Sequence, residues 1–170
     1  MQTLTTTHLP TRVSPSRVQS ASFALLRTDA STTATVARIA LGAVMLPHGL
    51  QKTVGWFGGY GFTNTMHWFT DTMHVPWIFG FAAIVAESLG AIALLAGFAT
   101  RIAALGVGAV FLTAVVMIHS QFGFFMNWDG AQAGEGVEYF LLGFAVVTTV
   151  LIQGGGRFSV DGYLTHRSLR

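Results

Sequence analysis

PWIFGFAAIVAESLGAIALLAGFATRIAALGVGAVFLTAVVMIHSQF, residues 76–122, is the stretch of the sequence that decides the fold. It holds two apolar runs, 76–98 and 100–122, and each is near the length of about 20 residues that crosses about 30 Å of hydrocarbon as a helix. Almost nothing lies between the two runs beyond Ala99 and Thr100, so the two helices form an antiparallel hairpin. The stretch therefore predicts two membrane-spanning helices joined by a tight turn.

Charged residues are scarce along the whole chain. They make up 9% of the 170 residues, against roughly 25% in an ordinary soluble domain, while apolar types make up 52%. A soluble protein of this size needs a charged surface, so a lipid-facing surface is the natural explanation, and the length allows one compact domain. The chain has no cysteine, which excludes disulfides, thiolate nucleophiles and cysteine-ligated metals. The net charge of +2 does not indicate nucleic acid as a partner.

Two more apolar segments flank the hairpin, at 34–52 and 137–153. Both are marginal in length for a membrane span and gain from their neighbours. A buried helix of a soluble protein is rarely apolar all round, so four spanning helices explain the pattern better than a soluble core. We therefore predict an all-α integral membrane protein, a four-helix bundle over residues 34–153 in contact with the lipid bilayer.

Loop positions and basic residues predict the orientation of the bundle. With four crossings, the two longer connections, 53–75 and 123–136, lie on one face and both chain ends lie on the other. Only Lys52 falls on the side of the longer loops. Eight basic residues fall on the terminal side: Arg12, Arg17, Arg27, Arg38, Arg101, Arg157, Arg167 and Arg170. The positive-inside rule then makes both termini cytoplasmic.

The two ends of the chain differ from the apolar middle. Residues 1–33 hold thirteen serines and threonines, three arginines and a single acid, Asp29. No apolar period there lasts long enough to pack, so we interpret this segment as a disordered basic tail. A transit peptide has a similar composition and is the alternative. We expect residues 154–170 to form a cytoplasmic C-terminal tail.

The two longer loops are rich in aromatic residues. Trp56, Trp68, Trp77 and Trp128, which are all the tryptophans of the chain, lie in them or at their edge. Aromatic residues favour the water–lipid interface and glycines permit tight turns, so we expect the loops to form a lid over the outer helix ends. Two interpretations stay open: a plain aromatic belt, or an aromatic mouth that includes Trp56 and binds a flat ligand such as a quinone.

Glu87 stands at the centre of the segment 76–98, and an ionisable residue within a spanning helix is costly and points to function. At 1.5 Å per residue, Glu87 lies ~16 Å and Arg38 ~21 Å from the outer ends of their helices. A long arginine reaching outward meets Glu87, so we predict an Arg38–Glu87 ion pair inside the bundle. The pair either fixes the register of the helices or leaves Glu87 as a catalytic, proton-handling residue.

His48, Gln51 and Lys52 share one face of the first predicted helix, because they are three and four residues apart. Pro47 lacks an amide proton, so the helix can kink just before this cluster and open a polar notch. Lys52 alone fits an ordinary snorkelling residue. His48, ~6 Å below the outer end, lies too deep for a mere surface residue. We therefore take all three as ligand-binding candidates and His48 also as a catalytic candidate.

A third polar group surrounds the last loop. His119 lies near the outer end of its helix, at a depth similar to that of His48, and Asn127 and Glu138 precede or begin the last helix. Acids suit a helix N-terminus, which explains Glu138 without function, and an outer ligand-binding pocket is the alternative. Two histidines on different helices also permit haem ligation, but nothing else supports it and a donor to a quinone carbonyl fits His119 better. We predict no metal site.

Ordered motifs recur along the chain, among them HGLQK at 48–52, VAESLG at 85–90 and VDGYL at 160–164. With their surroundings they resemble the DoxX family of small four-helix bacterial inner-membrane proteins, over about residues 35–163. The resemblance implies a four-helix bundle with both termini inside. It also places these residues at positions that resemble the recurrent polar and glycine motifs of the family: Arg38, His48, Gly49, Lys52, Gly58, Gly59, Glu87, Gly90, Arg101, His119, Asn127 and Glu138.

The function that the resemblance implies is redox chemistry at a membrane. The family is named for a subunit of a thiosulfate:quinone oxidoreductase, and other members are linked to defence against oxidative stress or aromatic compounds. We therefore expect a subunit of a quinone-linked system, with a bound quinone and a soluble redox enzyme as partner. The chain has no cofactor motif of its own, so whether it is an enzyme stays open. The alternative is a non-enzymatic membrane anchor or scaffold, or a small-molecule binding or permeation protein.

Overall fold

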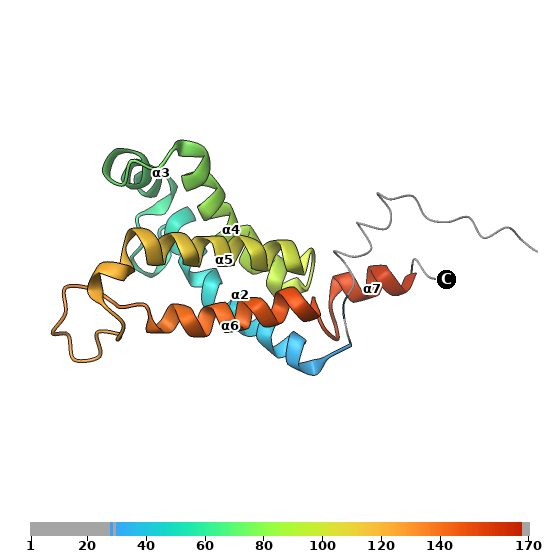
Figure 1. Cartoon of the computed structure of the whole chain (residues 1–170). Coiled ribbons are helices and arrows are strands. Elements are labelled where there is room, and N and C mark those ends of the chain that lie inside the picture. The colour runs from blue at the N-terminus through green and yellow to red at the C-terminus, as the bar shows by residue number, and fades with distance from the viewer. Residues whose placement is uncertain (1–27, 29, 168–170) are drawn as a thin grey trace, which may run out of the picture.

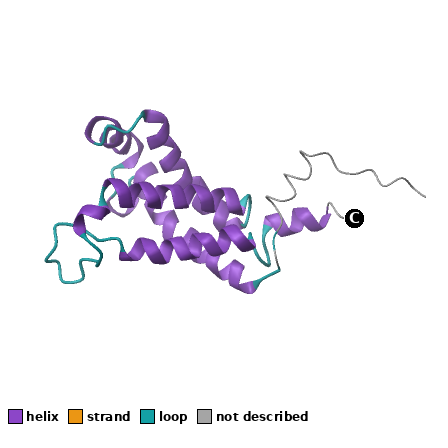
Figure 2. Ribbon diagram, viewed as in Figure 1, coloured by secondary structure: helices purple, strands orange, loops and turns teal. Residues whose placement is uncertain are grey.

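The computed structural model describes residue 28 and residues 30–167, and the regular elements among them are all helical (Figures 1 and 2). The α-helices are α2 (Thr32–Thr53), α3 (Gly61–His67), α4 (Trp77–Ala96), α5 (Thr100–Met117), α6 (Glu138–Gln153) and α7 (Val160–Arg167). Shorter pieces join them: η1 (Trp56–Gly58), η2 (Trp68–Thr72), which is π-helical, and η3 (His119–Phe122). The prediction of an all-α fold is confirmed.

Of the described helices, α2, α4 and α5 are long and apolar enough to cross a membrane by length and composition. Helix α6 is apolar but has only 16 residues, which matches the marginal length expected for the last segment. The predicted segments for α2, α4 and α6 agree with the helices within two residues at each end. Helix α5 ends at Met117, before the predicted end at 122, because Ile118 leaves the helical region with φ −126° and ψ −55°.

Helices α2, α4, α5 and α6 form one bundle. Helix α2 contacts α4 and α6, and α5 also contacts both of these helices (Figure 1). In lipid such packing depends on close van der Waals contact, which small residues allow. Gly42 and Gly49 bring α2 against α4, and Gly143 of α6 lies against the ring of Phe111 on α5. The buried apolar core consists of Leu41, Met45, Ala91, Leu94, Ala104, Val107, Phe111, Val147 and Val150.

The bundle has two distinct ends. Helix α3 and the loop 123–137 lie at one end, and α7 lies at the other end (Figure 1). The start of the described chain lies at the same end as α7, because the N–H of Arg157 donates a hydrogen bond to the carbonyl of Ser31 at 3.2 Å. Both longer connections therefore share one end, as the four predicted crossings require. We name the ends the α3 end and the α7 end; that the α7 end is cytoplasmic stays a prediction.

The segment after α6 packs onto the α7 end of the bundle. Its glycines 154–156 are buried, and so are Ser159 and Asp161. This part of the predicted C-terminal tail is therefore packed on the bundle, and its cytoplasmic location stays a prediction. Of the predicted disordered segment 1–33, residues 1–27 and 29 lie outside the described residues, and α2 begins at Thr32.

Candidate functional site

The ammonium group of Lys52 and the carboxylate of Glu87 form an ion pair between α2 and α4. Nζ of Lys52 lies 2.5 Å from Oε2 of Glu87, and the two side chains are 24% and 6% exposed. Oε2 of Glu87 is buried, and within the described residues it accepts no hydrogen bond of good geometry. The nearby ammonium group of Lys52 is therefore what compensates its negative charge. Ionisable groups inside an apolar bundle are costly, which makes the pair the leading functional candidate.

Close packing of the two helix backbones brings this pair together. A Cβ atom on Gly49 would lie 2.6 Å from the carbonyl oxygen of Glu87 and 2.6 Å from Cα of Ser88, so the backbones touch at this level. Lys52 stands three residues beyond Gly49, about one helical turn, and its side chain reaches the carboxylate. The helix contact thus decides which cation meets Glu87.

The predicted ion pair between Arg38 and Glu87 is wrong. The depth estimate counted both helices from a common outer level, but α2 ends only four residues after Gly49, whereas α4 begins ten residues before Glu87. At 1.5 Å per residue, α2 ends ~9 Å deeper than α4 at the α3 end. Arg38, eleven residues before Gly49, therefore lies ~16 Å further toward the α7 end.

Arg38 is a structural residue of the α7 end. Its side chain is buried and donates to the carbonyls of Leu94 (2.8 Å), Leu95 (2.7 Å), Gly155 (2.6 Å) and Phe158 (2.9 Å). Leu94 and Leu95 belong to the last turn of α4, where carbonyls lack a full set of helical partners and the helix dipole is negative. Arg38 thus joins α2, α4 and the segment after α6.

Asp161 caps the first turn of α5 from 61 residues further along the chain. Its buried carboxylate accepts hydrogen bonds from the N–H of Ala99 (2.8 Å) and from the N–H (2.9 Å) and hydroxyl (2.7 Å) of Thr100. Sequence reasoning missed Asp161, because a capping residue is normally sought directly before its helix. Only its place in the VDGYL motif singled out this part of the chain.

His48 continues the inward-facing stripe of α2 and is nevertheless exposed. The buried positions Ala34, Arg38, Leu41 and Met45 recur at the spacing of one helix face, and 48 and 52 follow at the same spacing. The stripe is buried as far as Met45 and exposed at His48, whereas the neighbouring Gly49 is buried against the backbone of α4. His48 is less covered than its predicted depth implied, and it stands one helical turn from Lys52.

Gln51 and Trp56 belong to the turn that follows α2. The side-chain nitrogen of Gln51 donates to the carbonyl of Phe57 at 3.2 Å, and a Cβ atom on Gly59 would collide with the backbone of Gln51. Phe57 adopts a φ of 54°, a left-handed conformation that residues with side chains rarely take. Gln51 therefore stabilises this turn, and Trp56, which is 61% exposed, stays a candidate for ligand contact.

Helix α3 and the turn η2 cover the end of α2 and the flank of α4. Thr65 and Met66 are buried, and the ring of Phe69 packs where a side chain of Gly80 would lie. The predicted lid is thus present over α2. The sequence did not predict its helices, because 54–76 shows neither a long apolar run nor a regular period.

Asp71 and His67 form an exposed pair on this lid. The hydroxyl of Thr70 donates to Oδ1 of Asp71 at 2.7 Å, and Nδ1 of His67 lies 3.0 Å from Oδ2. These contacts, that of Thr70 first, hold the pKa of Asp71 below its usual value. Both side chains are more than two-thirds exposed, so this pair belongs to the surface of the lid.

His119 lies at the end of α5 and faces the loop 123–137. Its Nδ1 atom is 2.8 Å from the carbonyl oxygen of Glu135, and its ring packs at 4.6 Å on the ring of Phe140. Within the described residues no hydrogen bond or ring contact joins it to His48. The observed partners of His119 are those of a residue that holds a loop.

Asn127 and Glu138 also fold the loop 123–137. Asn127 donates from its side-chain nitrogen to the carbonyl of Gln132 and accepts from the N–H of Gln132, each at 2.9 Å. One carboxylate oxygen of Glu138 accepts from the N–H of Met126 at 3.2 Å. The structure thus explains both residues by the loop, and within the described residues no ion pair or hydrogen bond connects them to Lys52.

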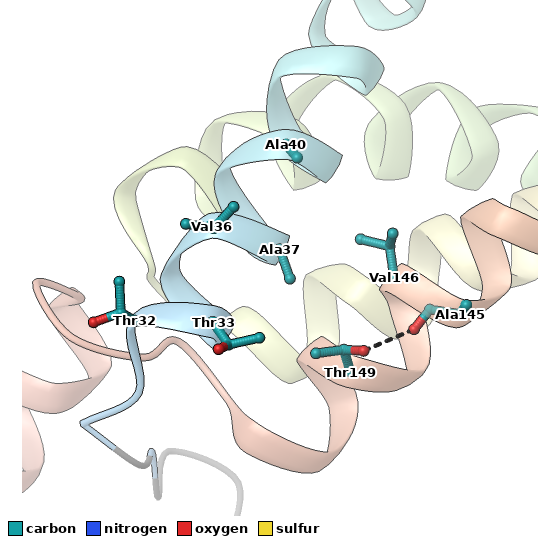
Figure 3. A pocket seen from close by; sticks show the side chains of 8 residues that line it. All are labelled: Thr32, Thr33, Val36, Ala37, Ala40, Ala145, Val146 and Thr149. Carbon is teal, nitrogen blue, oxygen red and sulfur yellow. Dashed lines mark hydrogen bonds between the residues drawn. The ribbon is translucent and has the colours of Figure 1, made fainter.

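A shallow groove of about 540 Å³ runs between α2 and α6 near the α7 end (Figure 3). Its walls are formed by Thr32, Thr33, Val36, Ala37, Ala40, Ala145, Val146 and Thr149. The hydroxyl of Thr149 donates to the carbonyl of Ala145 and so stays within its own helix. The groove contains no charged side chain and none of the predicted site residues, so it offers no chemistry.

The ion pair one helical turn from the exposed His48 is the arrangement best suited to binding or proton-transfer chemistry. It combines a hydrogen-bond donor, a cation and a carboxylate that can hold a proton. Among the described residues, no group of three His, Cys, Asp or Glu side chains is placed to hold a metal. Fold and site together define a small polytopic α-helical membrane protein with an ion pair between α2 and α4 and an exposed histidine one helical turn from it.

The comparison with family models agrees with this description. The DoxX model matches residues 33–120, a little over half of the 170-residue chain, so the chain belongs to the DoxX family. The match includes both partners of the ion pair and ends before the motif at 160–164. No curated protein and no solved structure was found to match the chain.

Proposed function

We propose that this protein is a membrane subunit of a quinone-linked redox system, of the kind that serves defence against oxidative stress, in the inner membrane of a bacterium. The observation that carries the proposal is the Lys52–Glu87 pair, which lies one helical turn from the exposed His48 in a lipid-embedded bundle. A quinone headgroup is flat, lipid-soluble and bears oxygen acceptors. Two donors one helical turn apart, next to a carboxylate, match that chemistry.

Each residue of this candidate site has a distinct role in this proposal. His48 and Lys52 donate hydrogen bonds to the headgroup oxygens, and Glu87 holds the proton that is exchanged when the charge on those oxygens changes. Trp56 supplies an exposed aromatic surface at the end of α2. A bound quinone supplies the electron-carrying chemistry, which the side chains of this cysteine-free protein do not provide.

The electrons come from a partner in this proposal. Reduction of a quinone to a quinol consumes two electrons and two protons, and a soluble redox enzyme is the source of the electrons. Protons reach the headgroup through Glu87. His119, Asn127 and Glu138 are left out of the ligand site, because their partners lie in the loop 123–137.

Quinone content tests the proposal. Protein purified in mild detergent should carry lipid-soluble quinone in stoichiometric amount, measured by extraction and chromatography. His48→Ala and Lys52→Met should each lower the bound quinone at least tenfold, because each removes a donor, which is worth about 1.4 kcal/mol or more. His67→Ala, at an exposed histidine of the lid, is the matched control and should change nothing. Wild-type protein without quinone would refute the proposal.

A scaffold function is the second candidate, and the loops at the α3 end favour it. Trp128 is 81% exposed, and Phe57 and Phe125 are each 66% exposed, so this end offers aromatic anchors to a protein partner. The same purification separates the two functions. A scaffold would carry no stoichiometric quinone and would co-purify with a soluble enzyme, and Trp128→Ser would release that enzyme.

A further inference from the structure

The groove between α2 and α6 is an apolar recess on the surface of the bundle (Figure 3). Its volume of about 540 Å³ lies within the range of roughly 300–1,000 Å³ that is typical of ligand sites. The side chains of Ala37, Ala40, Ala145 and Val146 line its middle, and its threonines lie toward the α7 end. None of the lining residues is charged, so the groove suits an apolar chain and offers no charged partner to an ion.

The groove widens toward the α3 end. Helices α2 and α6 contact each other, and Figure 3 shows them meeting near Thr33 and Thr149 and spreading apart toward Ala40. Helix α2 runs from the α7 end to the α3 end, because its first residues lie beside the segment that leads into α7. The wide end of the groove therefore points toward the half of the bundle that holds His48.

One side of α2 connects the groove with His48. Val44 and His48 stand seven and eleven residues after Ala37, which is close to two and three full turns, so all three lie on one side of the helix. Val44 is 43% exposed and His48 is exposed, whereas Met45 on the neighbouring side is buried. His48 thus lies ~16 Å from Ala37 along this side. The stretch 39–47 between them contains no charged residue.

The facing side of α6 continues in the same way. Leu142 and Tyr139 stand four and seven residues before Val146, about one and two turns, so they share its side of α6. Leu142 is 67% and Tyr139 is 40% exposed. Exposed apolar surface thus extends from the groove toward the α3 end on both helices, and on α2 it ends at the imidazole of His48.

This layout matches a molecule with a long apolar tail and a small, uncharged polar end. A phospholipid would bring a charged phosphate, for which the walls of the groove contain no cation, and Lys52 is already paired with Glu87. A quinone headgroup is uncharged and requires a hydrogen-bond donor, which the ring of His48 provides. The branched isoprenoid tail of a membrane quinone suits walls built largely from alanine and valine.

We propose that the ligand is a long-tailed isoprenoid quinone, with its headgroup at His48 and its tail along one side of α2 in the groove between α2 and α6. This assignment rests on the proposed function, because it specifies the quinone of that same site. The quinone enters from the bilayer, and the length of its tail determines how tightly it binds. A headgroup with a short tail reaches His48 but leaves the groove empty.

Two quinones with the same headgroup test the assignment, one with a tail of many isoprene units and one with a single unit. Full-length protein in detergent micelles, freed of endogenous quinone, is titrated with each, and quenching of its tryptophan fluorescence gives the affinity. Because both quinones also partition into micelles, the ratio of the two affinities is compared between variants. The wild type should prefer the long tail by about tenfold or more, since the tail buries apolar surface.

Groove variants locate the tail. Ala40→Phe and Ala145→Phe fill the groove from opposite walls, and each should abolish the preference for the long tail. Ala82→Phe places the same side chain at an exposed alanine of α4, outside the groove, and should keep the preference. His48→Ala should weaken the binding of both quinones, because both lose the same donor. Two groove variants on different helices keep the test valid if one of them does not fold.

The outcomes separate this assignment from the proposed function. A wild type without preference, or an unchanged preference in folded groove variants, would overturn the assignment and leave quinone binding in place. Protein that binds neither quinone would refute both. Bound phospholipid that the long-tailed quinone does not displace, measured by mass spectrometry, would assign the groove to lipid instead. A dimer that both groove variants convert to monomer, measured by light scattering, would assign it to a second copy; either result overturns the assignment.

Discussion

Glu87 is the residue on which the interior chemistry depends, because its buried carboxylate is compensated by the Lys52 ammonium group. Breaking a buried ion pair by removing one partner leaves an uncompensated charge, whereas replacing both partners by neutral groups is far less costly. The two residues are therefore expected to be energetically coupled. This coupling separates a genuine buried pair from two charges that merely lie near each other.

A double-mutant cycle measures that coupling. Lys52→Met should lower the free energy of unfolding by about 3–5 kcal/mol, because it leaves the carboxylate buried without a cation. Glu87→Gln should cost less, since Lys52 is partly exposed, and the double variant should recover most of the loss. Unfolding in detergent micelles gives the values, with Arg157→Met at an exposed cation as control. Equal and additive effects would show that the pair is not coupled.

At the scale of elements, the contact between α2 and α4 sets the axial position of one helix relative to the other. Gly49 allows the two backbones to touch beside Glu87, and Gly42 repeats this contact seven residues earlier, against Ala91 and Leu94. At Gly49 of this seam, no side chain larger than a hydrogen atom fits without displacing one of the two helices. The close contact between α2 and α4 thus fixes the position of Lys52 relative to Glu87.

Gly49→Ala tests the seam. The added methyl group would overlap the backbone at Glu87 and Ser88, so α2 should move away and the protein should lose about 1–3 kcal/mol of stability. The variant should also weaken the coupling between Lys52 and Glu87 in the same double-mutant cycle. Gly90→Ala is the matched control, because its Cβ would meet its nearest atoms at 3.9 Å and fits without displacement. Equal stability of both variants would contradict this role.

At the scale of the whole molecule, charge is arranged in two layers with an apolar layer between them. Lys52 and Glu87 lie toward the α3 end, and Arg38 with Asp161 lies at the α7 end. The α7 end also carries Arg101 and Arg157, whereas Lys52 is the only basic residue of the other side, counting Lys and Arg in the sequence. From the positive-inside rule we therefore predict that the α7 end faces the cytoplasm.

Reporter fusions test this orientation. A reporter active only in the cytoplasm should work when fused after residue 170 and fail when inserted in the exposed loop at Asp129. A reporter active only outside the cytoplasm should show the opposite pattern. Moving basic residues to the other side, with Arg101→Gln and Arg157→Gln plus two lysines in the loop, should increase the fraction of inverted molecules. A C-terminus found outside would overturn the orientation.

The sequence by itself determined the four long helices and their order. Four apolar runs, the minimal connection at Ala99 and Thr100 and the two longer loops predict the bundle, because apolar length and loop length are local properties. The same reasoning identified Glu87 as an ionisable residue whose place inside a membrane-spanning helix costs free energy. It did not find α3, because the lid carries no regular apolar period.

Only the tertiary structure decided which groups meet. The count of residues favoured Arg38 as the partner of Glu87, whereas the helix contact at Gly49 selects Lys52. Asp161 caps α5 from 61 residues away, a pairing that no local pattern contains. The physical reason is the same in both cases: each contact depends on the relative height of two elements, and backbone packing sets that height after the helices have formed.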